Sequence, residues 1–99
     1  MLTLGAKPGQ SFDIAASRLR LERIEPALQS ATLRLWTHPD SERGELVTVS
    51  VNGWTSVQCY FGNETRWFRV KLSTNYALRE TSARLAFDAH EDLAISRVE

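Results

Sequence analysis

The sequence predicts an all-β protein, and three features of the chain support this prediction. Apolar and polar residues alternate along much of the 99 residues, as in "RLRLERI", which is typical of strands with one buried face. Turn residues recur about every 8–12 positions, a spacing typical of β-sandwiches and barrels. No stretch shows the helical periodicity of apolar residues over the length of a long helix. We therefore expect about nine short strands in a sandwich or barrel with one shared core.

The expected strands follow one another in chain order, separated by turn residues. Lys7-Pro8-Gly9 ends the first strand, Pro26 bends the chain after the third, and Asn52-Gly53 is the strongest hairpin signal. The stretch 73–82 is irregular and is compatible with one helical turn. The expected strands span residues 2–6, 11–15, 18–24, 31–36, 45–51, 55–61, 66–72, 83–87 and 93–98.

Alternation within these strands also predicts which side chains face the core. It places Leu19, Leu21 and the stem of Arg23 on one side of the third strand. It places Trp67 on the opposite face of its strand from Phe68.

The charges of the chain balance, with 12 cationic and 12 acidic residues. A neutral chain has no bulk attraction to nucleic acid or to an anionic membrane, so any such role requires local clustering of charge. Ten of the cations are arginines, whose planar guanidinium suits phosphate, carboxylate or guanine.

The remaining composition predicts a reduced, cytoplasmic protein without a membrane partner. Cys59 is the sole cysteine and sits in an apolar run, so a buried thiol is expected rather than a reactive one. The first residues do not resemble a signal peptide, and no apolar run has the length of a membrane helix.

The chain also contains an internal similarity. The stretch "RLRLERIEPALQSATLRLW" lies over "RVKLSTNYALRETSARLAF" with one or two small gaps. We therefore expect one compact domain, 1–99, in which two repeats, about 1–48 and 49–99, share a core with approximate two-fold symmetry. Chance similarity between strand-rich segments is the alternative.

Both ends of the chain follow the pattern of a known family. The opening "MLTLGAKPGQSFDI" and the tail "ARLAFDAHEDLAISRVE" resemble the termini of the carbon storage regulator family, small bacterial RNA-binding regulators of translation. The matching residues at the front are Met1, Leu2, Leu4, Lys7, Gly9, Ser11 and Ile14. Those at the back are Leu85, Phe87, Ala89, Asp92, Leu93, Ile95, Arg97 and Glu99.

The resemblance implies a fold, a partner and a site. Members form interlocked dimers in which the first strand of one subunit lies beside the last strand of the other, and RNA binds there. A tandem chain would be a monomer acting as a pseudo-dimer, binding GGA motifs in messenger leaders, or a small regulatory RNA, and repressing translation. The implied RNA-binding residues are Leu4, Lys7, Ser96 and Arg97. The second equivalent position, residues 44–54, carries no cation, so one site of two is expected.

The first strand departs from the family at one contact position. The family has Thr-Arg where this chain has Gly5-Ala6. This departure and the neutral charge favour an alternative, a protein-interaction module or an antagonist of a regulator without RNA binding. An unrelated all-β accessory protein is a third possibility.

Other candidate residues have structural interpretations. Arg97 either contacts a base or phosphate or pairs with Glu91 or Glu99. Exposed arginines on several strands form either a stacking platform with aromatic residues or a solvated face paired with Glu22 and Glu64; they are Arg18, Arg20, Arg34, Arg66, Arg69 and Arg84. The tryptophans are expected mainly in the core, with Trp54 the most exposed.

No motif indicates catalysis, a metal site or a cofactor. His38 and His90 are each followed by an aspartate two residues on, but two such pairs at opposite ends do not supply three convergent ligands. We expect turn residues there, and we expect no enzyme activity.

Overall fold

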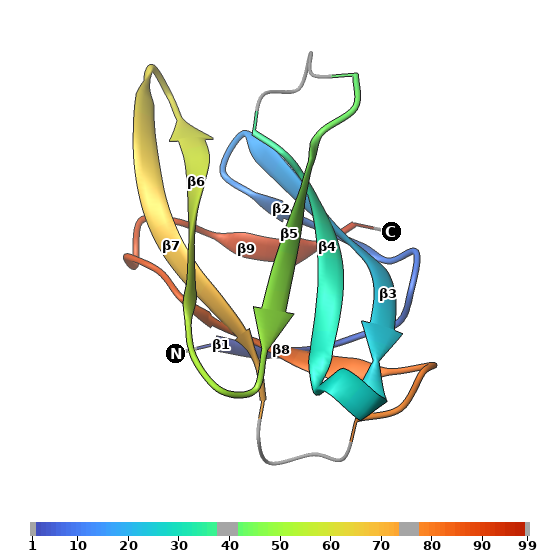
Figure 1. The fold of residues 1–99 in the computed structure, drawn as a ribbon. Helices are drawn as coiled ribbons and strands as arrows, with labels where there is room; N and C mark the ends of the chain where they lie inside the picture. The colour runs from blue at the N-terminus through green and yellow to red at the C-terminus, as the bar shows by residue number, and fades with distance from the viewer. Residues whose placement is uncertain (1, 38–41, 74–77, 99) are drawn as a thin grey trace.

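Strands make up nearly all of the regular structure in the computed structural model, which describes residues 2–37, 42–73 and 78–98 (Figure 1). The prediction of an all-β fold with about nine strands is confirmed. The strands are β1 (Leu2–Ala6), β2 (Ser11–Ile14), β3 (Ser17–Glu25), β4 (Ser30–Trp36), β5 (Glu45–Ser50), β6 (Thr55–Phe61), β7 (Glu64–Leu72), β8 (Ala83–Asp88) and β9 (Ile95–Arg97).

A short helical turn follows β3. The 3-10 turn Pro26–Leu28 joins β3 to β4, because Pro26 fixes the backbone angle that starts the turn. Gln29 then takes a left-handed conformation with φ 51°, which turns the chain into β4. Of the irregular stretch 73–82, residues 74–77 lie outside the described residues, and Arg79 and Ser82 form an isolated bridge.

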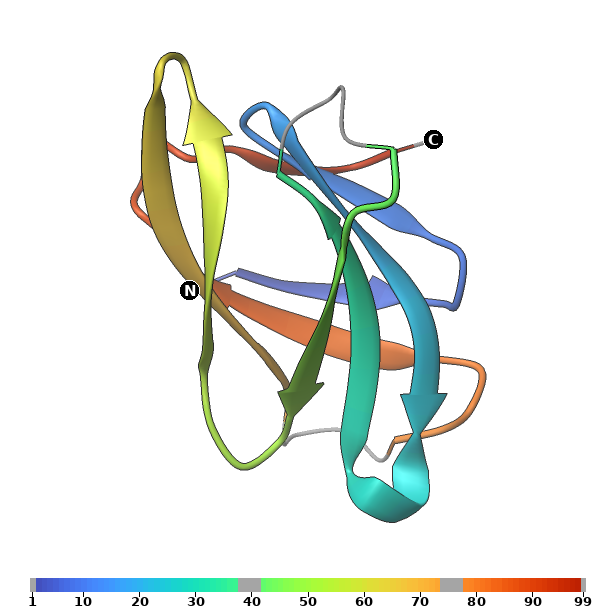
Figure 2. The same ribbon diagram turned by 45° about the horizontal axis from the view of Figure 1, so that its top comes forward.

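The strands form two antiparallel sheets. The four-stranded sheet has the order β1-β8-β7-β6, and the five-stranded sheet has the order β5-β4-β3-β2-β9. β1, β8 and β9 cross the molecule at a steep angle to β3, β4 and β5 (Figures 1 and 2). The apolar faces of both sheets meet in one buried cluster, whose largest members include Phe12, Phe68 and Phe87.

The side-chain alternation holds along most strands but is interrupted in β3. Leu19 and Leu21 are fully buried, as expected. Arg23 is exposed, because the register of β3 against β4 shifts between Leu21 and Arg23. This β-bulge inserts an extra residue, so Ile24 enters the core in place of the Arg23 stem. The prediction for Arg23 is therefore wrong.

Two three-stranded meanders have equivalent pairing. In β3 and β4, Leu19 lies opposite Leu35. In β7 and β8, Val70 lies opposite Phe87. These pairs occupy matching places in the two similar stretches of sequence, so the segments β2-β3-β4 and β6-β7-β8 are related in both sequence and pairing.

The two halves exchange their first strands. β1 precedes the first meander but pairs with β8 of the second, whereas β5 precedes the second meander but pairs with β4 of the first. β9 then returns to pair with β2. These pairings place β1–β4 with the first of the two similar segments and β5–β9 with the second.

A close backbone approach explains the glycine at this connection. Gly44 has φ +69°, and a Cβ there would lie 2.7 Å from the carbonyl oxygen of Leu35. A side chain at this position would push β5 away from β4, so glycine is required for the strand exchange to begin here.

The two sheets are also joined by polar bonds at the β2–β3 turn. The Ser17 hydroxyl donates to the Thr37 carbonyl at 2.7 Å and accepts from the Tyr60 N–H at 2.9 Å. The Ala16 N–H donates to the Tyr60 carbonyl at 2.9 Å. These bonds satisfy backbone groups near the end of the edge strand β6, whose hairpin with β7 projects at one end of the molecule (Figure 2).

The free cysteine is buried, as the sequence predicts. Cys59 is fully buried on β6, and burial raises the pKa of its thiol. No helix in the described part of the chain is long and apolar enough to cross a membrane.

Candidate functional site

A cavity of about 560 Å³ lies where the end of β1 meets the start of β8. Its walls come from three parts of the chain that are distant in sequence: β1 with the turn after it, the segment around 78–84, and the end of β9. The lining residues are Gly5, Ala6, Lys7, Gln10, Leu78, Arg79, Ser82, Ala83, Arg84 and Arg97.

The lining of this cavity is strongly cationic. Lys7, Arg79, Arg84 and Arg97 all contribute to it, and no aspartate or glutamate is among the described residues that line it. The chain as a whole is neutral, so this is local clustering of the kind that a nucleic-acid or other polyanion site requires. We call this cavity, with its four cations, the cationic pocket.

Arg97 enters the pocket from the five-stranded sheet. It lies opposite Phe12, on the same side of β9 as Ile95, so it emerges at the rim of the core as alternation predicts. Its guanidinium lies 5.8 Å from the centre of the Phe12 ring. It also donates a hydrogen bond to the Gly5 carbonyl on β1. These two contacts fix the orientation of the guanidinium and leave other N–H donors for a ligand.

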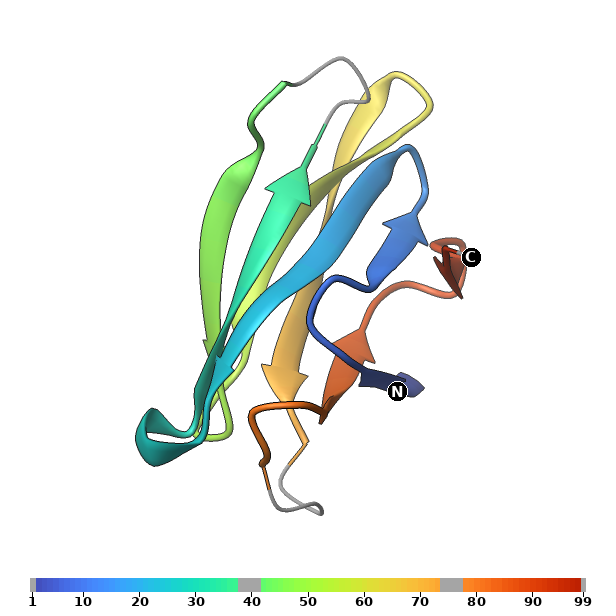
Figure 3. The same ribbon diagram turned by 90° about the vertical axis from the view of Figure 1, so that its right-hand side faces the viewer.

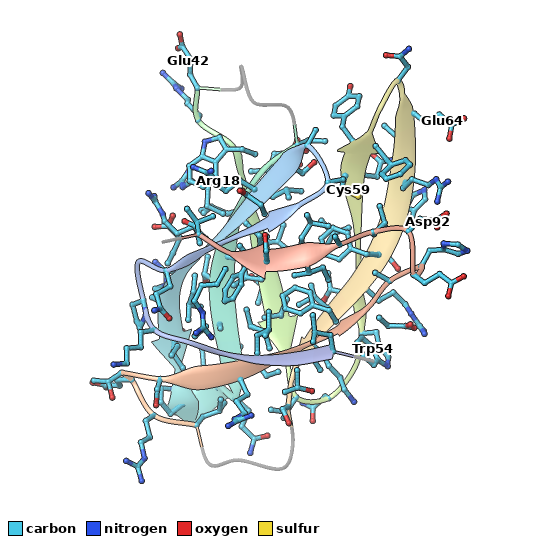
Figure 4. All side chains as sticks on the ribbon, turned by 180° about the vertical axis from the view of Figure 1, so that it is seen from behind. Arg18, Glu42, Trp54, Cys59, Glu64 and Asp92 are labelled. Carbon is cyan, nitrogen blue, oxygen red and sulfur yellow. The ribbon has the colours of Figure 1, made fainter. Side chains whose placement is uncertain are left out.

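The two terminal strands are not neighbours in one sheet, so that prediction is wrong. β1 is the edge of the four-stranded sheet and pairs with β8, whereas β9 is the edge of the five-stranded sheet and pairs with β2. The two edges lie on the same side of the molecule, and side chains fill the space between them (Figures 3 and 4). The Arg97 side chain, rather than a strand ladder, connects them.

A tight turn positions Lys7 at the pocket. The Lys7 N–H donates to the Gln10 side-chain oxygen at 2.8 Å, and the Gln10 N–H donates to the Lys7 carbonyl at 3.0 Å. Gly9 has φ 94°, and its N–H donates to the Leu21 carbonyl at 2.7 Å. The turn is thus fixed to β3 while the Lys7 side chain stays exposed.

Arg79 comes from the stretch 73–82, which has no regular sequence pattern, whereas Arg84 lies on the expected strand 83–87. The Arg79 N–H donates to the Ser82 carbonyl at 3.3 Å, which closes the turn before β8. Arg84 lies opposite Gly5 on β8, where the absence of a side chain on Gly5 leaves the floor of the pocket open. Arg79 was missed because no periodic pattern spans residues 78–82, and Arg84 was seen only as one of several arginines on sheet faces.

The other two expected RNA-binding residues lie elsewhere. Leu4 is partly buried against the core and does not line the pocket. Ser96 lies opposite Asp13 on the outer side of the five-stranded sheet. Lys7 and Arg97 are therefore the expected residues that the fold brings together.

The pseudo-equivalent position in the other half lacks the corresponding charges. Strand register places Ser50 where the first half has Lys7, and Thr32 where the second half has Arg84. The turn 27–29 contains no cation, and no described strand pairs with β6 where β9 pairs with β2. The described residues thus form one cationic pocket at this kind of position.

Most other arginines are paired in the manner of a solvated sheet face. Arg18 pairs with Asp13 at 2.8 Å, and Arg20 and Arg34 share Glu22 at 2.6 and 3.1 Å. Arg66 lies 3.7 Å from Glu64. The interpretation of these side chains as a paired, solvated face agrees with this geometry.

No tryptophan or histidine is among the described residues that line the cavity. Trp67 is 60% exposed, whereas Trp54 is partly covered, so the expectation that Trp54 would be the most exposed is wrong. His90 lies 3.3 Å from Asp92 within a turn, and His38 lies outside the described residues. No group of three or more metal-ligating side chains occurs within residues 2–37, 42–73 and 78–98.

Comparisons with protein-family models, with curated proteins and with solved structures find no match to this chain.

Proposed function

We propose that this protein is an RNA-binding regulator of translation, a diverged tandem form of the carbon storage regulator family. The terminal sequence patterns support this proposal, and so does the exchange of first strands between two similar halves. Members of that family are interlocked dimers. Fusion of two interlocked subunits would produce one chain whose halves exchange their first strands. The protein would act in the cytoplasm as a monomer.

The observation that carries the proposal is the cationic pocket. Four cations converge from distant parts of a neutral chain, with no carboxylate among the described lining residues. Such a cluster favours a polyanion, and a guanidinium held in a fixed orientation suits the O6 and N7 acceptors of guanine. A GGA-containing loop presents unpaired guanines beside phosphates, so it offers both kinds of partner.

Each residue of the pocket has a proposed role. Arg97 would bind a guanine edge, because Phe12 and Gly5 hold its guanidinium in place. Lys7, which is exposed on a fixed turn, would bind phosphate. Arg79 and Arg84 would contact the backbone of the loop. Leu4 would only help to hold β1 against the core, and Ser96 would make no contact.

The test is the affinity for a GGA-containing RNA hairpin, measured by fluorescence anisotropy at two salt concentrations. Arg97→Ala should weaken binding about fivefold to a hundredfold, since one good bidentate contact is worth about 1–3 kcal/mol. Arg23→Ala is the matched control, because Arg23 is an exposed arginine on β3 whose partner is Glu25. Binding that is absent, or equal in Arg97→Ala and Arg23→Ala, would contradict the proposal.

A protein-interaction module is the second candidate. The chain has alanine, Ala6, at the position where the family carries arginine, so it has no cation there. Ala6 is 3% exposed and lies on the core side of β1. Loss of that contact together with a neutral charge would suit a member that binds a protein in place of RNA. A stoichiometric, RNase-insensitive partner recovered from a bacterial lysate, together with no RNA binding, would favour this candidate.

A further inference from the structure

The outer face of the four-stranded sheet carries an exposed aromatic residue among cations. β7 alternates, so Trp67, Arg69 and Lys71 point away from the core, whereas Phe68 and Val70 are buried in it. Trp67 is 60% exposed and lies opposite Gln58 on β6. An exposed tryptophan at this position contributes little to the core and presents its ring to solvent, where a ligand could stack on it.

Trp54 holds the two neighbouring cations in place. The centre of its ring lies 5.1 Å from Cζ of Arg69 and 4.8 Å from Nζ of Lys71. Figure 4 shows Trp54 beside β7, at the margin of the molecule. Arg69 also pairs with Asp88 on β8. These contacts order two long side chains that would otherwise lose rotamer freedom on binding a ligand.

This face continues into the cationic pocket. Arg84 lines the pocket and lies on β8 two residues before Ala86, which is opposite Lys71. Diagonal neighbours of this kind on a sheet are about 7–8 Å apart. From Lys71 the row continues along β7 through Arg69 to Trp67, over about 13 Å. We call Arg84, Lys71, Arg69, Trp54 and Trp67 the outer track.

We propose that the outer track binds single-stranded RNA that continues from the loop held in the cationic pocket. A base would stack on Trp67, and Arg69, Lys71 and Arg84 would contact successive phosphates. This choice of RNA rests on the proposed function.

The composition of the face favours RNA over a protein ligand. Its exposed apolar part is a single indole, Trp67, at the end of a row of cations, whereas a protein-docking patch is a contiguous apolar surface with few charges at its centre. Of the five exposed large hydrophobic residues described, Trp67 is the one that shares a strand face with two cations held by a second ring. Alternating cations and aromatic rings are typical of surfaces that bind single strands.

The test uses two RNAs and a matched set of variants. The first RNA is a labelled oligouridine of roughly a dozen nucleotides, which has no GGA and no stable fold. The second is a GGA hairpin without single-stranded flanks. The variants are Trp67→Ala, Trp67→Phe and Arg97→Ala, with Leu46→Ala as the control. Leu46 is exposed to the same extent as Trp67, at 60%, but lies on β5 of the other sheet.

We expect Trp67→Ala to weaken oligouridine binding about fivefold to a hundredfold, because one stacked base is lost. Trp67→Phe should retain most of the affinity, since a phenyl ring still stacks, and Leu46→Ala should change it less than twofold. Arg97→Ala should leave oligouridine binding within about twofold of wild type, and Trp67→Ala should do the same for the flankless hairpin. The thermal midpoint of each variant checks that the fold is intact.

The outcomes separate this inference from the proposed function. Oligouridine binding that depends on Trp67 supports the outer track even if the hairpin is not bound, in which case the pocket proposal alone fails. Oligouridine binding that is absent in the wild type, or equal in Trp67→Ala and Leu46→Ala, overturns the outer track. Capture of a protein through Trp67 in the absence of any RNA binding also overturns it.

Discussion

Arg97 illustrates how position in a strand sets the facing and the contacts of a single side chain. Its exposure at the end of β9 follows from alternation, which also buries Leu93 and half-buries Ile95 on the same side. Its contact with the Gly5 carbonyl joins positions 92 residues apart, and no local pattern predicts such a contact. The side of β9 on which Arg97 lies was therefore predictable from the sequence, whereas its hydrogen-bond partner, the Gly5 carbonyl, was not.

Glu22 is the acidic residue whose titration should affect stability most visibly. Its carboxylate accepts hydrogen bonds from Arg20 at 2.8 Å and from Arg34 at 3.1 Å. The hydrogen bond from Arg20 lowers the pKa of Glu22 below its ordinary value of 4.5, against the opposing effect of partial burial. The charged form is thus favoured in the folded state, so its contribution to stability is present above pH 4.5 and is lost as the pH falls through the lowered pKa.

Replacing Glu22 with glutamine should therefore have a pH-dependent effect. We expect Glu22→Gln to lower the free energy of unfolding at pH 7 by about 0.5–1 kcal/mol, the usual range for a partly exposed ion pair. The difference from wild type should shrink as the pH falls below 4.5, because the wild-type carboxylate becomes protonated. Urea denaturation at pH 7 and pH 3 measures both values. A difference that is equal at the two pH values would show that charge is not the cause.

Strand β1 positions the pocket, and its contribution depends on one residue without a side chain. Gly5 has open space where a Cβ would be, and it lines the pocket beside Arg84 and Arg97. Glycine is unfavourable within a strand, and the proposed RNA would use the space that Gly5 leaves open. In the sequence, Gly5 is visible only as a departure from the pattern of the carbon storage regulator family, whereas the open space beside it is formed when β8 pairs with β1.

A side chain at this position should block the pocket without harming the fold. Gly5→Val fits the backbone, because its φ is not positive and no atom lies within 4 Å of the added Cβ. We expect at least a tenfold loss of affinity for the GGA hairpin, with a thermal midpoint equal to or above that of wild type, since valine favours strands. Anisotropy and thermal melting measure the two quantities. Unchanged hairpin binding would show that the RNA does not enter beside β1.

The elements themselves were largely predictable, and the exceptions have physical causes. The alternation located the strands closely, because a half-buried strand requires period-two patterning. The bulge after Leu21 was not visible, since Glu22, Arg23 and Ile24 are compatible with more than one register. The pairing of β9 with β2 was also not visible, because a three-residue strand carries too few side chains to specify a neighbour.

The whole molecule is two similar halves joined by exchanged strands. The internal similarity of sequence predicted a shared core, and the matched pairs Leu19–Leu35 and Val70–Phe87 agree with it. It could not predict which half receives each first strand, because β1 and β5 are both short aliphatic strands suited to either edge. That exchange is what brings β1 to β8 and so assembles the pocket from both halves.

The asymmetry between the halves is the central feature of the proposed mechanism. Lys7, Arg84 and Arg97 are present at one composite position, whereas Ser50 and Thr32 occupy the pseudo-equivalent one. A fused chain needs to maintain only one binding site, so the other is free to lose its cations. We therefore expect one RNA per chain, bound on one side of the pseudo-two-fold axis.

Amide chemical shifts, followed by NMR while a GGA hairpin is added, test this expectation most directly. The account predicts saturation at one RNA per chain, with the largest shifts at Gly5, Lys7, Arg84 and Arg97 and little change at Ser50. Shifts centred on Ser50 or on the outer side of the five-stranded sheet, or no shifts at all, would contradict it.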